Sequence, residues 1–303
     1  MKKILITGAN GFIAHHMAEY FSNKKYDVYA NYRRNTYRIK NIVVKPVQFD
    51  LNDIIYPDMP KFDYIIHTAA NTWVDGSLHD VMPYIENNVM ATGRFLEWVK
   101  KEQPQSRLCL FSSNEVLGPA KEGEYFKEES LYKPSNPYAA TKVSQEMLVY
   151  AFAHSFDLDM FTIRCMNVIG EREDEKKFIG KTIKAIRNNE KIIIHGTDKD
   201  NVASRHWIYA KDVAYIMEGL LKRANRKEVY HISGEEVDVY TLASKLFKLI
   251  NKRDMLETDV EFVDFHKARK GHDKRYSLSN QKIRDMGFNQ FTPIDEVIKK
   301  LVK

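Results

Sequence analysis

The N-terminal segment constrains the fold of this chain more than any other part of the sequence. The apolar run Lys3-Ile4-Leu5-Ile6-Thr7 has the length of a strand, and Gly8-Ala9-Asn10-Gly11-Phe12-Ile13-Ala14 follows it directly. Glycines at such a turn let the backbone approach a pyrophosphate, and a helix from about Phe12 to Ser22 offers its N-terminal amides to that anion. Ala14 replaces the usual third glycine, where only a small side chain is needed. The segment therefore predicts a dinucleotide site that includes Gly8, Asn10, Gly11, Phe12 and Ile13.

Strand and helix patterns alternate through the first half of the chain, which is typical of a parallel sheet covered on both faces. Apolar runs of strand length recur at residues 27–32, 47–51, 62–67, 108–111 and 161–165, and residues 229–232 are expected to return to the same sheet. We therefore expect an α/β fold: a Rossmann-type doubly wound parallel sheet with a smaller, interleaved C-terminal substrate lobe.

The smaller lobe is predicted from short strands at 192–194 and 260–263 and from helices near 241–251 and 279–286. We expect residues 1–165 plus about 205–232 to form the dinucleotide-binding domain. Residues 166–204 plus 233–303 would form the substrate lobe.

The second strand ends in Arg33-Arg34-Asn35, whereas sites for NAD of this type usually place an acidic residue there for the ribose 2′-hydroxyl. Two guanidinium groups match a 2′-phosphate instead, which favours NADP, with NAD as the alternative. The other reading is that both arginines are solvated loop residues. Further cofactor contacts are expected from the strand ends, at Asp50, Leu51, Ala69 and Ala70.

Tyr138 and Lys142 are four residues apart on a helix expected to begin near Pro137, so their side chains share one face. A neighbouring ammonium favours the phenolate and would lower the pKa of Tyr138, which makes it a candidate general base. The same spacing arises by chance in many helices. A catalytic role is favoured because the same chain also contains the glycine motif and the hydroxyls and carboxylate of Ser112-Ser113-Asn114-Glu115.

Composition excludes several classes of protein. The 303 residues carry a formal net charge of +6, but their 47 basic residues are scattered among 41 acidic ones, so we expect no nucleic-acid partner. We expect no leader and no membrane span. Cys109 and Cys165 lie in apolar strands without metal-ligand spacing, so we expect buried thiols, no metal site and a cytoplasmic protein.

Taken together, these motifs resemble the extended short-chain dehydrogenase/reductases. Within that family the chain resembles the nucleotide-sugar 4,6-dehydratases of the dTDP-glucose and UDP-glucose type, with some features of the GDP-mannose type. The resemblance covers essentially the whole chain and depends on residues 7–14, 67–70, 74–78, 86–89, 112–118, 138–142, 165–170, 205–212 and 270–276. The last two segments are the most discriminating.

The resemblance implies a mechanism. Tyr138 would take the proton of the sugar 4-hydroxyl while hydride leaves C-4 for the nicotinamide, with Lys142 holding the phenolate and Ser112 or Ser113 hydrogen-bonding the same oxygen. Glu115 would then remove the C-5 proton, water would leave from C-6, and the hydride would return to C-6.

One residue departs from the dTDP-glucose pattern, because Asn114 stands where that type carries an aspartic acid. An amide cannot deliver a proton as a carboxylic acid does. The GDP-mannose enzymes also lack this acid and are read as using the glutamate alone. Epimerase or UDP-glucuronate decarboxylase chemistry stays open as an alternative, and a non-catalytic dinucleotide-binding sensor is a further one.

By the same resemblance, a nucleotide-diphosphate sugar would be held by Asn167, Lys177, Phe178, Arg205 and Arg275, with the two arginines on the diphosphate. The charged run at 171–177 is otherwise expected to be a solvated loop. The helices at about 85–101 and 138–156 have long apolar faces. In the family that the chain resembles, such helices pair with their copies in a four-helix bundle, so the resemblance implies a homodimer. Alternatively, these faces only cover the sheet.

Overall fold

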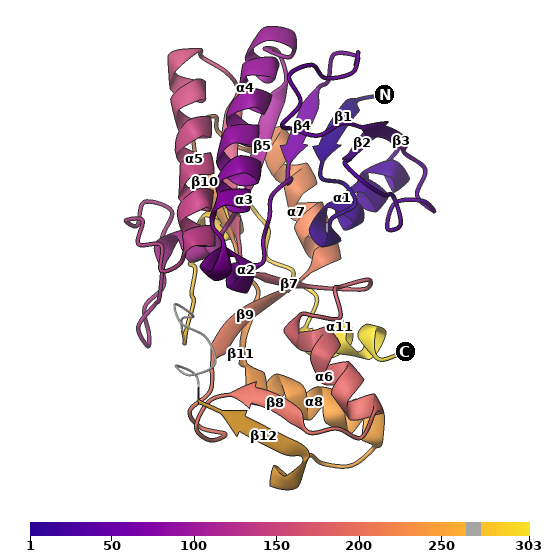
Figure 1. The fold of residues 1–303 in the computed structure, drawn as a ribbon, viewed down its shortest axis with the longest axis vertical. Coiled ribbons are helices and arrows are strands. Elements are labelled where there is room, and N and C mark those ends of the chain that lie inside the picture. Colours follow the sequence, from indigo (N-terminus) through magenta and orange to yellow (C-terminus); the bar gives the residue numbers. More distant parts are fainter. Residues whose placement is uncertain (265–273) are drawn as a thin grey trace.

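The computed structural model describes residues 1–264 and 274–303, and its centre is a seven-stranded sheet (Figure 1). The strand order is β10-β6-β5-β4-β1-β2-β3, and every neighbouring pair runs parallel. The strands are β1 (Lys3–Thr7), β2 (Asp27–Tyr32), β3 (Lys45–Gln48), β4 (Tyr64–His67), β5 (Arg107–Ser113), β6 (Met160–Cys165) and β10 (Val229–Ile232). The predicted Rossmann-type sheet is confirmed. In the discriminating segment 270–276, residues 270–273 lie outside the described residues.

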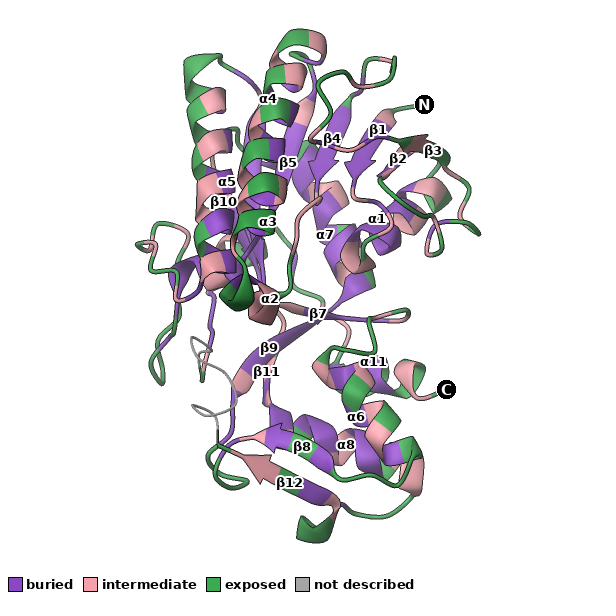
Figure 2. Ribbon diagram, in the orientation of Figure 1, coloured by how far each residue is buried: buried purple, intermediate pink, exposed green. Residues whose placement is uncertain are grey.

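Helices cover both faces of this sheet, and the alternation along β1 shows how the two faces are separated. Ile4 and Ile6 pack in a core with α1 (Phe12–Asn23) and α7 (Ala210–Arg223). Leu5 packs in a second core with α4 (Ala91–Glu102) and α5 (Pro137–Ser155). Successive strand residues point to opposite faces, so the apolar run of β1 is buried on both sides (Figure 2).

Two expected elements differ in their bounds. The third strand ends at Gln48 rather than continuing to residue 51, so Asp50 and Leu51 lie beyond the sheet. The helix expected from about residue 85 consists of three consecutive segments: α3 (Met82–Tyr84), a π-helical turn η1 (Ile85–Met90) and α4. A separate short helix, α2 (Val74–His79), precedes them. Such π-helical turns occur frequently at functional sites.

A smaller lobe lies beyond the carboxyl ends of the strands, drawn below the main sheet in Figure 1. It contains a three-stranded sheet in the order β11-β9-β7 and a parallel pair β12-β8. The strands are β7 (Asn167–Ile169), β8 (Ile192–His195), β9 (Ser204–Tyr209), β11 (Glu235–Asp238) and β12 (Val260–Val263). The lobe helices α6 (Phe178–Arg187), α8 (Val239–Asn251) and α11 (Ile294–Leu301) share one apolar core with these strands.

The helix expected near residues 279–286 packs elsewhere than in the lobe. It is present as α10 (Gln281–Asp285), and Ile283 and Phe288 are buried in the core of the main sheet. Lys282 fixes this position, because its ammonium donates to the carbonyl of Val229 and lies over the ring of Tyr230.

The two cysteines are buried free thiols, as expected. Within residues 1–264 and 274–303, no helix is both long and apolar enough to span a membrane.

Candidate active site

A cavity of about 1660 Å³ opens between the main sheet and the smaller lobe, at the carboxyl ends of the strands. This is where ligands bind in open parallel sheets. Among the residues predicted for the site, all but Arg275 line the cavity. The expected cofactor, catalytic and substrate residues are therefore brought together by the fold.

The glycine turn after β1 fits a dinucleotide. Gly8 has φ +64°, and a Cβ there would lie 2.9 Å from the Cα of Ala69. A Cβ on Gly11 would lie 3.0 Å from the carbonyl oxygen of Gly8. The helix α1 begins directly after Gly11 without a side-chain cap, so its first amides are free to meet an anion. The turn forms a narrow backbone cradle of the kind that a pyrophosphate requires.

The two arginines after β2 both line the cavity but differ in their contacts. Arg33 donates to the side-chain oxygen of Asn87 at 2.7 Å and forms a 3.4 Å ion pair with Asp50. Arg34 makes no hydrogen bond or ion pair with any residue in the described part of the chain. Arg34 is therefore the guanidinium available to an additional anion.

Tyr138 is in the first turn of α5, and its side chain is buried at the cavity. Burial raises the pKa of its phenol, the carboxylate of Glu115 raises it further, and a hydrogen bond with Ser113 lowers it. The sequence predicted a lowered pKa instead, on account of Lys142. That prediction is wrong for this arrangement, because desolvation dominates and the lysine makes its hydrogen bonds elsewhere.

Lys142 is buried one helical turn beyond Tyr138. Its ammonium donates to the carbonyl of Phe111 at 2.9 Å and to the side chain of Gln145. Burial lowers its pKa to about 8, partly offset by Glu146. The group still carries its charge at neutral pH.

The two adjacent serines of β5 have different partners. Ser112 donates to Glu146 Oε1 at 2.5 Å, and this carboxylate forms a buried ion pair with Arg164. Ser113 hydrogen-bonds the phenol of Tyr138 and accepts from the backbone N–H of Glu115 at 3.2 Å. Of the two predicted serines, Ser113 is the one that bonds Tyr138.

Glu115 follows β5 in a short 3₁₀ helix η2 (Asn114–Leu117) and lines the cavity beside Tyr138. Its Oε2 accepts a hydrogen bond of 2.8 Å from the amide of Asn136. Asn114 is buried next to it and also lines the cavity. A phenol, an ammonium and a carboxylate therefore all line the cavity.

Most of the predicted substrate residues also line the cavity. Arg205 is buried, donates to the carbonyls of Ser204 and Lys274, and lies over the ring of Tyr276. The Nδ2 of Asn167 is buried without a hydrogen-bond partner among the described residues, as expected of a group that bonds a ligand. Lys177 and Phe178 lie at the start of α6.

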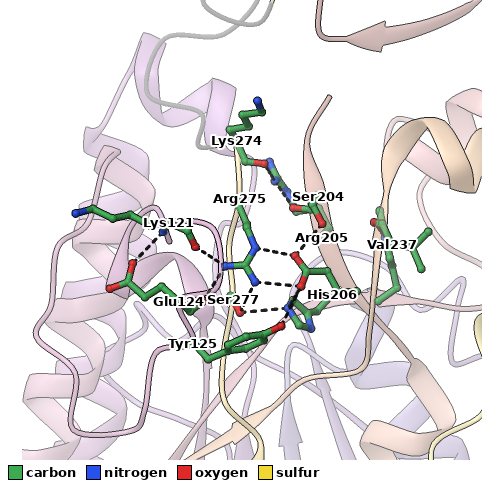
Figure 3. Close-up of polar contacts among 12 residues, drawn as sticks. Lys121, Glu124, Tyr125, Ser204, Arg205, His206, Val237, Lys274, Arg275 and Ser277 are labelled. Carbon is green, nitrogen blue, oxygen red and sulfur yellow. Dashed lines mark hydrogen bonds and ion pairs between the residues drawn. The ribbon is translucent and has the colours of Figure 1, made fainter. Parts of the chain in front are cut away.

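Arg275 was expected on the diphosphate, but it is not among the residues that line the cavity. Figure 3 shows the polar contacts that it makes instead. Its Nε and Nη2 donate to the carboxylate of Glu236, Nη1 donates to the carbonyls of Lys121 and Glu124, and Nη2 also donates to Ser277. All five N–H groups of the guanidinium are used within the protein. Arg275 therefore joins segments of the fold.

Glu173 is a residue of the site that the sequence did not reveal. It belongs to the charged run expected to be solvated, yet it lines the cavity, and its Oε2 is buried with no hydrogen-bond partner among the described residues. Burial raises its pKa to about 8. Nothing in a run of alternating charges indicates which one will be enclosed.

Comparison with known proteins gives this geometry a family context. The sequence profile of the GDP-mannose 4,6 dehydratase family matches residues 5–301. The dTDP-D-glucose 4,6-dehydratase of Homo sapiens is 30% identical over 100% of this chain and 89% of that protein. The trifunctional UDP-glucose 4,6-dehydratase/epimerase/reductase RHM1 of Arabidopsis thaliana is 34% identical over 99% of this chain, which spans only 46% of that protein.

Solved structures share the fold. The dTDP-glucose 4,6-dehydratase of Streptomyces venezuelae, crystallised with NAD, superposes with a TM-score of 0.89 at 24% identity, covering 99% of this chain and 95% of that one. UDP-sugar 4-epimerases are also among the structures that match.

Proposed function

Because this chain belongs to the GDP-mannose 4,6-dehydratase family, we propose that it is a nucleotide-sugar 4,6-dehydratase. It would convert a nucleoside-diphosphate hexose to the 4-keto-6-deoxy product with the loss of one water. Relatives with the same activity in their names align along nearly the whole chain, which supports this assignment.

The observation that carries the proposal is a carboxylate beside a buried tyrosine and lysine. Oxidation and reduction at a single carbon, as in an epimerase, requires only a group that moves the hydroxyl proton. Elimination of water also requires a base for the hydrogen on the carbon next to the ketone. Glu115 lines the cavity close enough to Tyr138 for its charge to raise the pKa of the phenol.

The residues divide the reaction between them. A bound nicotinamide dinucleotide would supply hydride acceptance and return within one turnover. Tyr138 would take the proton of the sugar 4-hydroxyl, assisted by its hydrogen bond with Ser113, which favours the phenolate. The ammonium of Lys142 bonds Phe111 and Gln145, so it would act on Tyr138 only through its charge, from one helical turn away. Glu115 then removes the proton on C-5, which the 4-ketone has acidified. Because Asn114 cannot supply a proton, Glu115 also protonates the departing 6-hydroxyl.

The substrate would lie across the cavity with its diphosphate toward the smaller lobe. The amide of Asn167, whose Nδ2 is buried without a hydrogen-bond partner in the described part of the chain, and the cation of Lys177 suit phosphate oxygens, and Arg205 also lines the cavity. Phe178, close to Trp207 at a ring distance of 6.2 Å, would contact the nucleoside. Arg275 is left out of this set, since its donors are used elsewhere.

For the cofactor we propose NADP over NAD. The dTDP-glucose 4,6-dehydratase and the UDP-glucuronic acid 4-epimerase among the matched structures were crystallised with NAD, so the proposed preference depends on the arginines of this chain alone. Arg34 lines the cavity and has no hydrogen-bond or ion-pair partner among residues 1–264 and 274–303, and a guanidinium pairs well with a 2′-phosphate.

Epimerase or decarboxylase chemistry is the second candidate, because epimerases share this fold and Asn114 departs from the dTDP-glucose pattern. These activities also use the tyrosine and lysine. They differ in the mass of the product, so one experiment separates them.

We also propose that two copies of the chain pair through α4 and α5. The apolar side chains of Met90, Met147 and Tyr150 are 48%, 41% and 51% exposed, and a second pair of these helices would cover them. Light scattering after size exclusion tests this proposal. Met147→Glu with Tyr150→Glu should convert a dimer to a monomer, and a wild-type monomer contradicts it.

The function is tested by incubating the protein with UDP-, dTDP- and GDP-hexoses and weighing the products by mass spectrometry. We expect one of them to lose one water without net consumption of cofactor. A new product of unchanged mass, distinguished from its substrate by NMR, would indicate an epimerase, and loss of carbon dioxide from a UDP-glucuronate sample would indicate a decarboxylase. No change in any sample would favour a sensor.

A further inference from the structure

Asn136 joins two parts of the site through one side chain. It is the N-cap of α5, where its Oδ1 accepts from the backbone N–H of Ala139 at 2.8 Å. Its Nδ2 donates to Glu115 Oε2 at 2.8 Å. The residue is 5% exposed and does not line the cavity.

The orientation of this amide is fixed by its partners. A backbone N–H can only donate, so the oxygen of the Asn136 side chain must face Ala139. The NH₂ group must then face Glu115, where it favours an ionised carboxylate that accepts. Replacing the amide by any group that only accepts hydrogen bonds would reverse this preference.

We propose that Asn136 is a positioning residue for Glu115: it holds the carboxylate ionised and directed into the cavity, and fixes it relative to the helix that carries Tyr138. This inference depends on the proposed role of Glu115 as the base for water loss. Because Asn136 does not reach the cavity, it can act on the substrate only through Glu115.

The helix start supports a role beyond capping. The backbone N–H of Tyr138 donates to Ser77 Oγ at 3.1 Å, and Pro137 occupies the first turn, where it needs no hydrogen-bond acceptor. The cap itself needs only an oxygen at position 136, and serine or aspartate supplies one as well as asparagine does. Only asparagine both caps the helix and donates to the carboxylate.

Two variants separate these roles. Asn136→Ser keeps a capping oxygen but is too short to donate to Glu115. Asn136→Asp also keeps the cap but places a second carboxylate against the first, which opposes ionisation. A purely structural cap predicts that both variants behave like the wild type.

The experiment measures water loss and nicotinamide reduction in the wild type and both variants across pH, with the melting temperature as a folding control. We expect both variants to keep hydride uptake but to lose water about ten- to a hundred-fold more slowly, as for one lost charge-assisted hydrogen bond. The loss should be larger for Asn136→Asp, and its acidic limb should move to higher pH. Glu115 also interacts electrostatically with Tyr138. Because Tyr138 is unchanged in the wild type and in both variants, it does not cause a difference between their pH profiles.

A cycle with Glu115→Gln gives a readout that does not depend on activity. If Asn136 acts through Glu115, the shifts in urea midpoint for Asn136→Ser and Glu115→Gln will not add in the double variant. Additive shifts together with wild-type rates and pH profiles in both Asn136 variants would overturn the inference. Failure of the wild type to dehydrate any nucleotide sugar would instead overturn the proposed function, so the two failures are distinct.

Discussion

The hydroxyl of Ser112 donates a hydrogen bond of 2.5 Å to Glu146. Its neighbour Ser113 bonds Tyr138 instead, so the two serines are expected to have different roles. Ser112→Ala should therefore destabilise the fold, by about 1–2 kcal/mol for one buried hydrogen bond to a charged group, and leave kcat largely unchanged. Ser113→Ala should lower kcat by about tenfold or more, because its hydroxyl bonds Tyr138, and should also lower stability through the loss of its cap on η2. Urea unfolding and steady-state kinetics on both variants check this contrast, and equal effects on kcat would refute it.

Tyr138→Phe should abolish turnover while the cofactor still binds. The phenol is the group placed to move the hydroxyl proton, and general base catalysis contributes about 10²–10⁴-fold. Isothermal titration with the cofactor, alongside product analysis, measures both properties. Retention of more than about a tenth of the wild-type rate would show that another group removes the proton.

Arg34→Ala should weaken NADP binding by about ten- to a hundred-fold and leave NAD binding unchanged, because only NADP presents a phosphate to this guanidinium. Arg33→Ala is the matched control. Its guanidinium already bonds Asn87 and Asp50, so its loss should affect both cofactors alike. Equal affinities of the Arg34→Ala variant and the wild type for NADP would contradict the proposed preference.

Glu173 should make the protein less stable as the pH rises. Its folded pKa, about 8, lies above the ordinary value of 4.5, so between these values the folded state binds a proton that the unfolded state has lost. The loss of folding stability that this causes is absent below about pH 4.5 and complete above about pH 8. Glu173→Gln removes the charge, and we expect it to stabilise the protein by about 1–2 kcal/mol at pH 8.5 and by nearly nothing at pH 5. Urea unfolding at both pH values checks this, and the same difference at each would exclude Glu173 as the cause.

The elements that local pattern encodes were predictable from the sequence. The turn from Gly8 to Ala14 requires small residues at fixed spacing, and the apolar runs of β1 and β6 are buried on both faces, so the fold and the family are confirmed. The sequence also indicated which strand ends meet, since the carboxyl ends of parallel strands share one edge of the sheet.

The contacts of Arg275, the pKa of Tyr138 and the burial of Glu173 could not be predicted, because they depend on packing between residues distant in the sequence. Glu236 binds Arg275 from 39 residues away, and no spacing in the sequence reveals that this guanidinium is already used. The neighbours of Tyr138 were predicted, but the desolvation that raises its pKa follows from packing, which a spacing of four residues does not show. The same holds for Glu173, whose carboxylate is buried at the cavity although it belongs to a charged run.

The most direct test of the account is a reaction in D₂O with the nucleotide sugar that the protein accepts, comparing the wild type with Glu115→Gln by mass spectrometry. We predict that the wild-type product lacks one water and carries one solvent deuteron, placed at C-5 by NMR. The variant should reduce the nicotinamide but yield neither change. A wild-type product that keeps its water, or a Glu115→Gln variant that dehydrates at the wild-type rate, would contradict the assignment of Glu115 as the base.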